Sequence, residues 1–300
     1  MLAAARLADA LDRTEGTSRF AADDRGSLTP VADEAADAVL EWRPSHGWRS
    51  CLPATDPRAG LLDLYLPLCS ATARRPIVVG HLGQSLDGFI ATESGDSQFV
   101  TGQANVVHMH WLRGLCDAVV VGAGTVAADD PQLTTRHVPG PHPLRVIFDP
   151  SRRLEPHYKV FTDPVAPTLY VCRQEHLAAG ETRMGQAPAV GLSAAEPGGE
   201  PAALLRLLRA RGCARVFIEG GGVTVSAFLE AGLLDRLHLA VAPVIIGQGR
   251  PAIRLRPPAE LSECRRPAYR VFRMGGDVLF DCDLRAAAAS DARADVLRIV

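Results

Sequence analysis

The chain has 300 residues, and its 32 basic and 34 acidic side chains give a formal net charge of −2. This balance argues against the broad cationic surface that nucleic acid or an anionic membrane attracts. With 47% hydrophobic and 22% charged residues and no apolar run of about 18 residues, the sequence also argues against disorder and against a membrane span. A globular protein acting on small molecules remains, built as one large domain or as a domain with an appendage.

Seven cysteines are scattered along the chain without a C-x-x-C pair. Their odd number and irregular spacing fit neither a disulfide framework nor a zinc knuckle. The N-terminal stretch meets Arg6 and Asp9 before an apolar run of signal-peptide length can form. We therefore expect a protein of the reducing cytoplasm, without a metal site.

Residues 1–75 differ in composition from the rest of the chain. A charged, alanine-rich opening leads to Trp42, Trp48 and a stretch rich in Pro, Gly and Arg. The apolar segment LLDLYLPL, residues 61–68, is suited to pack on a larger body. We expect an N-terminal extension of helical or irregular structure, anchored by this segment, whose role the sequence leaves open.

From Pro76 the pattern changes to short β-branched runs, glycine-rich turns and amphipathic stretches, which is typical of α/β proteins. Strands are expected at 76–82, 117–122, 144–149, 168–172, 214–219 and 237–246, with a further pair within 269–284 that turns at Gly275 and Gly276. Helices are expected at 201–212, from about 223 to 232, and at 103–115, the last with an apolar face of Val106, Val107, Met109, His110, Leu112 and Leu115.

The expected strands are apolar without alternation, which indicates burial on both faces. Tight turns between the last strands imply antiparallel additions to a mostly parallel sheet. The sequence therefore predicts a three-layer α/β fold with a central mixed sheet, and a C-terminal tail over residues 286–300.

Two glycine clusters directly follow expected strands and precede helices. The first contains Gly122 and Gly124, and the second is Gly220–Gly222. Glycine at this place exposes backbone N–H groups and a positive helix end to an anion, although a tight turn alone would also explain it. Two clusters in one domain favour a dinucleotide. A Rossmann fingerprint is disfavoured because Pro131 ends the first helix too early.

The segment 81–102 is the densest polar passage of the main body. Its hydroxyl and carboxylate side chains could simply form a turn and cap the helix expected at 103. Phe89, Ile90 and Phe99 are interleaved with them, as in the wall of a partly buried ligand site. We therefore count this segment among the candidate binding elements.

Six motifs follow one another in a recognisable order: SLDG (85–88), SGDSQFVTG (94–102), VVVGAGTVAADDPQLTTR (119–136), RVIFDPSRRL (145–154), FIEGGG (217–222) and LLDRLHLAVAPVIIGQG (233–249). In this order the chain resembles the C-terminal reductase domain of the bifunctional riboflavin-biosynthesis deaminase-reductase. The resemblance implies a dihydrofolate-reductase-like fold over residues 76–285. The deaminase strings H-x-E and P-C-x-x-C do not occur in the sequence, so we expect a reductase only.

The resemblance also implies an activity, namely reduction by NADPH of the ribosylamino group of 5-amino-6-(5-phosphoribosylamino)uracil to ribitylamino. Its substrate-binding positions correspond to Ser97, Arg113, Leu133, Arg136 and Glu219. Its cofactor-binding positions correspond to Gly83, Phe99, Thr125, Asp129, Gly221, Gly222, Val223, Thr224, Val225, Ser226 and Ala227. The paired arginines are suited to clamp a sugar phosphate.

Four further residues carry hypotheses about catalysis and cofactor choice. Arg152 and Arg153 follow a strand and are candidates for the 2′-phosphate of NADPH, although they also suit an exposed turn. Glu219 is placed to bond substrate hydroxyls or to take part in proton transfer, unless it merely caps the next helix. His81 stands where bacterial relatives usually have lysine and is a candidate proton donor.

Two alternatives to this activity stay open on the sequence. One is a dihydrofolate-reductase-like reductase of another pterin or heterocyclic metabolite, and the other is a non-catalytic NADP-binding protein. The family's usual homodimer could use the apolar strand expected at 237–246 as its interface, or a single chain could bury that strand.

Overall fold

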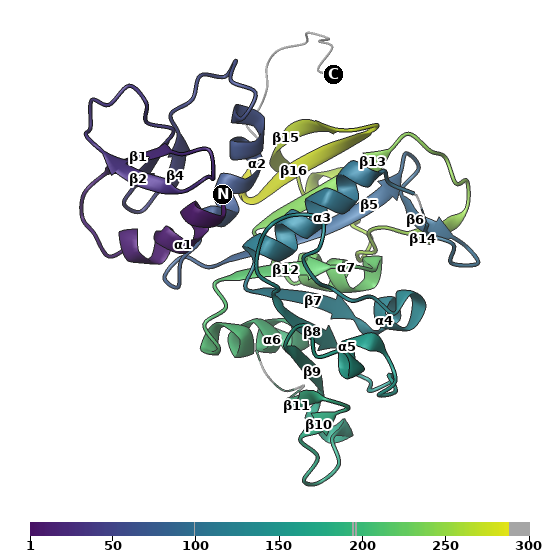
Figure 1. Cartoon of the computed structure of the whole chain (residues 1–300). Coiled ribbons are helices and arrows are strands. Elements are labelled where there is room, and N and C mark those ends of the chain that lie inside the picture. Colours follow the sequence, from purple (N-terminus) through teal and green to yellow (C-terminus); the bar gives the residue numbers. More distant parts are fainter. Residues whose placement is uncertain (99, 194, 196, 288–300) are drawn as a thin grey trace.

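The computed structural model describes residues 1–98, 100–193, 195 and 197–287. Its largest sheet has ten strands in the order β10-β11-β9-β8-β7-β12-β5-β13-β16-β15 (Figure 1). These strands are β5 (Ile77–Ser85), β7 (Ala118–Gly122), β8 (Leu144–Phe148), β9 (Thr168–Arg173), β10 (Arg183–Met184), β11 (Ala187–Leu192), β12 (Arg215–Glu219), β13 (Arg236–Ala242), β15 (Pro267–Met274) and β16 (Asp277–Ala287). From β11 to β13 every neighbouring pair is parallel, and β10, β16 and β15 add antiparallel edges. This arrangement confirms the predicted mixed sheet.

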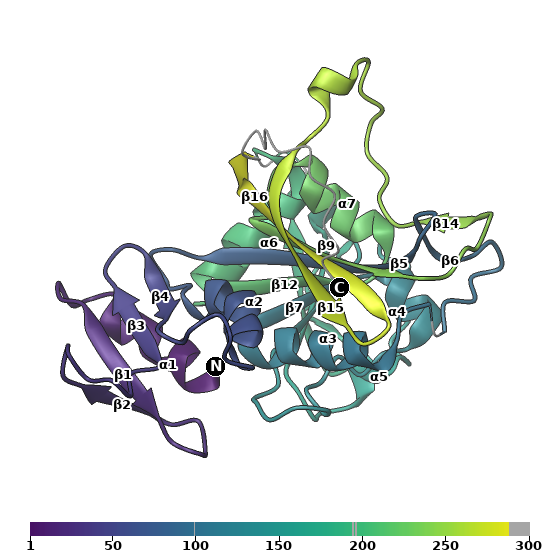
Figure 2. The same ribbon diagram turned by 90° about the horizontal axis from the view of Figure 1, so that it is seen from above.

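Helices cover both faces of this sheet. The helices are α3 (Gln103–Leu115), α4 (Ala123–Asp129), α5 (Lys159–Thr162), α6 (Gly199–Ala210) and α7 (Gly222–Glu230), and a small separate sheet joins β6 (Phe89–Thr92) to β14 (Gly249–Pro251). Figure 2 shows α6 and α7 on one side of the large sheet and α3 and α5 on the other. The fold therefore has the three layers expected from the sequence.

The core explains why the central strands lack alternation. In β7, Val119 and Val121 belong to the hydrophobic cluster under α3, whereas Ala118 and Val120 belong to the cluster under α6 and α7. Successive side chains of a strand point to opposite faces, so a strand that is covered on both sides must be apolar at every position. The burial of the central strands on both faces, predicted from their sequence pattern, is thus confirmed.

The strand predicted at 237–246 is shorter than expected. β13 ends at Ala242, directly before Pro243, which has no N–H to donate to a neighbouring strand. Beyond it Ile245 is 73% exposed. β13 also pairs on both sides within the chain, with β5 and β16, so it offers no free edge for a dimer.

The expected apolar face of α3 is wrong in part. The helix spans the predicted residues, but the side chains that it buries include Asn105 and His108, while Val106 and Val107 are only half-buried. Burial of polar groups is stable only where they find hydrogen-bond partners. Those partners come from the sheet and from the N-terminal extension, and no local pattern encodes them.

The N-terminal extension is more ordered than the sequence suggested. Helices α1 (Leu2–Leu11) and α2 (Ala59–Cys69) flank a four-stranded antiparallel sheet of β1 (Ser18–Ala22), β2 (Leu28–Val31), β3 (Leu40–Arg43) and β4 (Gly47–Ser50). Trp42 and Trp48 face each other across β3 and β4, with ring centroids 5.2 Å apart. The expectation of a helical or irregular segment is wrong, because four of the extension's elements are strands of one sheet. Cross-strand aromatic pairs of this kind stabilise short hairpins.

The extension is joined to the main body through a shared core. Leu64, Leu66 and Leu68 of α2 lie in the same hydrophobic cluster as strands β5, β7 and β12, which confirms the predicted anchor. Arg215 of β12 also donates a 2.8 Å hydrogen bond to the carbonyl oxygen of Ala5 in α1. Extension and body therefore form one continuous packed unit.

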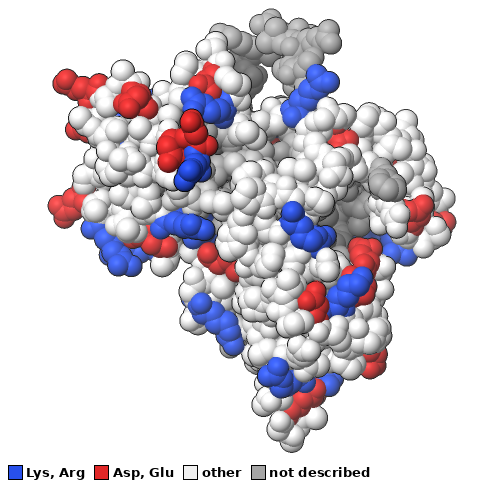
Figure 3. Space-filling view, in the orientation of Figure 1, with Lys and Arg blue, Asp and Glu red and all other residues white. Residues whose placement is uncertain are grey.

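Charge is spread evenly over the visible surface. Figure 3 shows basic and acidic side chains interspersed on this face, without a continuous region of one sign. Within the described residues no helix is both long enough and apolar enough to cross a bilayer. All seven cysteines carry free thiols.

Candidate nucleotide cleft and buried substrate-side pair

A cleft of about 690 Å³ opens at the carboxyl ends of the parallel strands. Its walls come from the turns that follow β7 and β12, from the end of β8, and from the 90–97 segment. In open α/β sheets the carboxyl edge is where ligands bind, because the turns there present backbone N–H groups and helix N-termini. The cleft has the volume of a small-molecule site.

The turn between β12 and α7 presents backbone donors to this cleft. Gly220 adopts a φ of +92°, a left-handed conformation that favours glycine. A Cβ on Gly222 would lie 2.2 Å from the carbonyl oxygen of Ala252, so only glycine fits there. No side chain caps the N-terminus of α7, and its first N–H groups remain available to an anion.

The two glycine clusters pack directly against each other. A Cβ on Gly122 would lie 2.1 Å from Oγ1 of Thr224, and the Gly221 N–H donates a 2.9 Å hydrogen bond to Oγ1 of Thr125. The α4 helix that follows Gly122 ends after Asp129. This short helix agrees with the sequence argument against a Rossmann fingerprint, and the interlocked turns explain why both clusters need glycine.

Four arginines contribute to the cleft walls: Arg153, Arg173, Arg250 and Arg254. Arg173 is paired with Glu200, whereas the side chain of Arg153 is 68% exposed and lies 3.9 Å from the nearest oxygen of Asp149. Arg152 does not line the cleft, and its guanidinium is paired with Glu181, which does not line the cleft either.

The sequence reasoning missed three of these arginines. Arg173 ends β9, and the rule that sites form at the carboxyl ends of parallel strands could have found it. Arg250 and Arg254 reach the cleft because β14 pairs with β6, and no pattern in the nearby sequence predicts this pairing.

About half of the predicted binding positions line the cleft: Ser97, Thr125, Asp129, Gly221, Gly222, Val223, Thr224 and Ala227. Burial raises the pKa of the Asp129 carboxyl. Val225 instead lies in the core, and Ser226 accepts a 2.8 Å hydrogen bond from the Arg254 N–H. Gly83 lies against Thr101 on the opposite side of β5. The predicted position Phe99 is outside the described residues.

Beside the cleft, Glu219 at the end of β12 forms a buried ion pair with Arg113 of α3. The Arg113 Nε–H donates to Glu219 Oε2 at 2.7 Å, a second guanidinium N–H contacts Oε1, and a third donates to the Thr134 carbonyl oxygen at 3.2 Å. Burial alone would lower the pKa of Arg113, but the Glu219 carboxylate outweighs it and raises this pKa. Arg113, predicted to bind phosphate, is thus already partnered.

The loop before β8 brings the other predicted substrate residues to this pair. Leu133 is buried with a φ of +55°, and Arg136 bonds Gln132 Oε1 at 2.6 Å. Burial and the nearby charge of Arg113 lower the pKa of Arg136. The Arg136 guanidinium forms no ion pair with any described carboxylate.

His81 lies next to Glu219, since the two residues are register partners on β5 and β12. It is buried and donates through its Nε2–H to Asn105 Oδ1 at 2.8 Å, and Asn105 in turn donates to Thr101 Oγ1. Burial lowers the pKa of His81 to about 4, so the ring is neutral at pH 7. A neutral histidine positions its neighbours more readily than it supplies a proton.

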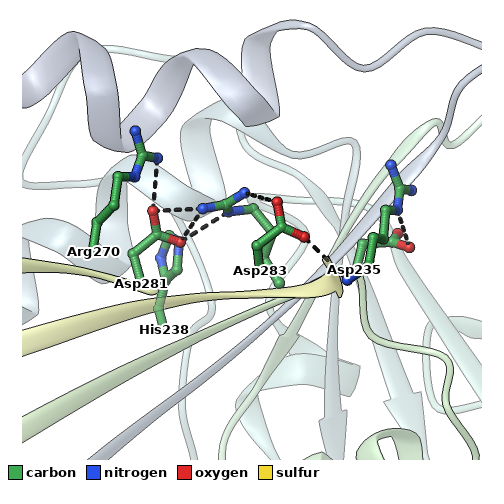
Figure 4. Close-up of polar contacts among 7 residues, drawn as sticks. Asp235, His238, Arg270, Asp281 and Asp283 are labelled. Carbon is green, nitrogen blue, oxygen red and sulfur yellow. Dashed lines mark hydrogen bonds and ion pairs between the residues drawn. The ribbon is translucent and has the colours of Figure 1, made fainter. Parts of the chain in front are cut away.

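Behind His81 a chain of buried polar groups crosses from the extension to the C-terminal strands. The hydroxyl of Tyr65 lies 2.7 Å from His108 Nδ1, and His108 Nε2 lies 3.1 Å from His238 Nδ1. Figure 4 shows His238 beside Asp281, with Arg270 on the other side of that carboxylate. Among the described residues this histidine cluster does not form a group that could hold a metal ion.

Fold and cleft together define a three-layer α/β protein with a cleft and an uncapped helix N-terminus at the carboxyl edge of its sheet. The chain belongs to the RibD C-terminal domain family, whose model matches residues 76–271. It is 33% identical over 227 residues to the 2,5-diamino-6-ribosylamino-4(3H)-pyrimidinone 5′-phosphate reductase of Methanothermobacter thermautotrophicus, covering 69% of this chain and 97% of that one.

The relatives include longer proteins. The chain is 33% identical over 179 residues to the riboflavin biosynthesis protein RibD of Aquifex aeolicus, and it spans 49% of that protein's length and 59% of its own. Among solved structures, a deaminase/5-amino-6-(5-phosphoribosylamino)uracil reductase from Thermotoga maritima matches with a TM-score of 0.58 and 26% identity, over 75% of this chain and 59% of that one.

Proposed function

We propose that this protein is an NADPH-dependent reductase that converts the ribosylamino group of a phosphoribosylamino pyrimidine to ribitylamino. The observation that carries the proposal is the uncapped α7 N-terminus in a cleft lined by four arginines, directly beside the Glu219–Arg113 pair. The names of the archaeal and bacterial relatives support the same reaction and the same substrate class.

The residues of the cleft fit a dinucleotide phosphate. Gly222 leaves no room for a side chain, and the uncapped N-terminus of α7 would offer backbone N–H groups to a pyrophosphate. Arg153 stands near the end of β8 with most of its side chain exposed, so it is our candidate for the 2′-phosphate in place of Arg152. A bound NADPH would supply hydride from its nicotinamide.

The substrate would lie between the cleft and the Arg113 loop. Arg136, which has no carboxylate partner in the described part of the chain, would bind the sugar phosphate, and Arg113 would add a second positive charge while loosening its contact with Glu219. Ser97 lines the cleft and can donate a neutral hydrogen bond. These groups would hold the sugar C1 at near-attack distance, which is the main contribution a protein makes to hydride transfer.

The reaction adds one hydride to C1 and one proton, and the ribose ring must open before the hydride adds. Glu219 is our candidate for bonding the sugar hydroxyls and moving that proton, because it ends β12 beside the glycine turn. His81 would act by holding Asn105 and, through it, Thr101. His81→Ala should therefore lower turnover with little change in NADPH affinity, and normal turnover would remove the residue from the catalytic machinery.

Activity is tested by following NADPH oxidation at 340 nm with the phosphoribosylamino pyrimidine as substrate, and by identifying the ribityl product by mass spectrometry. Oxidation that requires the substrate supports the proposal. NADPH binding without turnover would favour a non-catalytic binding protein, and oxidation with dihydropterins alone would favour a pterin reductase. Arg136→Ala separates these enzymes further, since only a phosphorylated substrate should lose affinity.

Two further expectations concern the cellular compartment and the oligomeric state of the enzyme. The free thiols suit a reducing compartment, so we propose a cytoplasmic enzyme. The homodimer expected from the family would have to use a surface other than β13, such as the open edge of β15, where Tyr269 is 62% exposed. Light scattering coupled to size-exclusion chromatography measures the assembly directly.

A further inference from the structure

A second cavity, of about 730 Å³, lies where the N-terminal extension meets the main body. It shares no lining residue with the nucleotide cleft. Its floor includes Ile77 and Arg236, the first residues of β5 and β13, so it opens at the amino ends of the parallel strands. The nucleotide cleft opens at their carboxyl ends. The two sites are therefore at opposite edges of the sheet.

The body side of this cavity is a wall of ion pairs. Figure 4 shows Asp281 between Arg270 and His238, with Asp283 and Asp235 further along the same face. Arg285 Nε lies 2.6 Å from Asp235, and Arg236 Nη1 lies 3.2 Å from Asp283. These pairs neutralise one another and fix the guanidinium groups in place. The wall is thus rigid, and its two lining carboxylates are already engaged.

Arg75 of the cavity is also neutralised, by an ion pair of 2.6 Å with Asp12, but three other lining arginines have no carboxylate partner among the described residues. Arg49 follows the second tryptophan of the extension, and Arg209 lies near the end of α6 in the body. Among the described residues neither of them forms a side-chain hydrogen bond or an ion pair. Arg74 makes only a 3.3 Å contact with a backbone carbonyl, that of Asp12. The carboxylate of Asp63 is the single lining acid outside the ion-pair wall, so the cavity holds a surplus of positive charge.

We propose that this cavity binds a phosphorylated small molecule, with Arg49 and Arg209 contacting the phosphate from opposite sides. Guanidinium groups bind phosphate through paired charge-assisted hydrogen bonds, which makes the anion their natural partner. The volume lies within the range of small-molecule sites, and Trp48 and Leu66 supply an apolar wall for the organic part of the ligand. Because one arginine belongs to the extension and the other to the body, the ligand bridges the two.

The test is calorimetric titration of the full chain with inorganic pyrophosphate, in the presence of saturating NADP⁺ to block the nucleotide cleft. The wild type should show a binding event in addition to any at the proposed Arg113–Arg136 phosphate site. Arg49→Ala/Arg209→Ala should weaken this event at least tenfold, whereas Arg136→Ala should leave it unchanged. Arg25→Ala/Arg266→Ala is the matched control, because it removes two exposed arginines that line neither cavity. This control should bind like the wild type.

Absence of pyrophosphate binding to the wild type, or equal weakening in both double variants, overturns the proposal. Tryptophan emission gives an independent reading, because Trp48 lines the cavity and lies 5.2 Å from Trp42. Emission should change on titration in the wild type and in the control, and stay constant in Arg49→Ala/Arg209→Ala. If NADP⁺ does not bind, the proposed nucleotide site fails, but a pyrophosphate event that is lost in Arg49→Ala/Arg209→Ala would still support the second cavity. The two failures are therefore distinguishable.

Discussion

Replacing Glu219 by glutamine should destabilise the protein strongly, although the substitution changes only one atom. The side chains of Arg113 and Glu219 are 8% and 10% exposed, and they are joined by two hydrogen bonds. Without the carboxylate, the charge of Arg113 stays buried with only neutral acceptors, namely the amide oxygen of the substituted side chain and the carbonyl oxygen of Thr134. Breaking a buried pair in this way costs about 3 to 5 kcal/mol.

The two charges should be coupled, because they solvate each other. Arg113→Met combined with Glu219→Gln removes both, and buried pairs can be replaced by uncharged residues with little loss. We expect the double variant to recover most of the stability lost by Glu219→Gln alone. Substrate affinity should not recover with it if Arg113 contributes to phosphate binding.

Equilibrium unfolding in urea, followed by circular dichroism, measures both effects. Glu230→Gln is the control, since it breaks the exposed pair with Arg256, whose side chain is 89% exposed. An exposed pair contributes at most about 1 kcal/mol. The reasoning is refuted if Glu219→Gln loses no more stability than this control, or if the double variant is no more stable than Glu219→Gln.

Three further predictions follow from the site. The depressed pKa of His81 means that, as the pH falls, the unfolded chain takes up the proton before the folded one does. The free energy of unfolding should therefore fall by on the order of 3 kcal/mol as the pH drops from 6.5 to 4. Urea midpoints measured over this range should fall less steeply for His81→Asn than for the wild type. Gly222→Ala places a Cβ 2.2 Å from a backbone carbonyl oxygen and should weaken NADP⁺ binding at least tenfold, whereas Gly60→Ala, in a helix with open space, should stabilise by up to about 1 kcal/mol. Arg153→Ala should raise the KM for NADPH but not for NADH, while Arg152→Ala should leave that ratio unchanged.

Each of these has a contrary result. A pH dependence of stability identical in wild type and His81→Asn would mean that the ring titrates normally in the fold. Retention of NADP⁺ affinity in Gly222→Ala would place the cofactor away from the turn. An equal rise in both KM values for Arg153→Ala would exclude contact with the 2′-phosphate.

Much of the main body could be predicted because it depends on local pattern. The apolar runs located the central strands, and two glycine clusters after strands marked two turns that the structure packs together, through Gly122 with Thr224 and Gly221 with Thr125. The family motifs then selected residues such as Ser97 and Thr125, which do line one cleft. Each of these features depends on neighbouring residues, so it leaves a pattern that can be recognised in a short stretch of sequence.

Other features of the site depend on residues far apart in the sequence and leave no local pattern. Arg113 and Glu219 stand 106 positions apart, and Arg250 reaches the cleft only because β14 pairs with β6. The expected apolar face of α3 did not include Asn105 and His108, which the structure buries because the sheet and the extension provide their hydrogen-bond partners.

The sequence by itself determined the class of fold, the central strands of the large sheet and the glycine turns that follow two of them. The tertiary structure alone decided which charges meet: that Glu219 holds Arg113, that Arg153 rather than Arg152 faces the cleft, and that the extension closes a second arginine-lined cavity. The reason is physical. Backbone preferences and burial act over a few residues, but a charge is stabilised by whatever the completed chain places within a few ångströms of it.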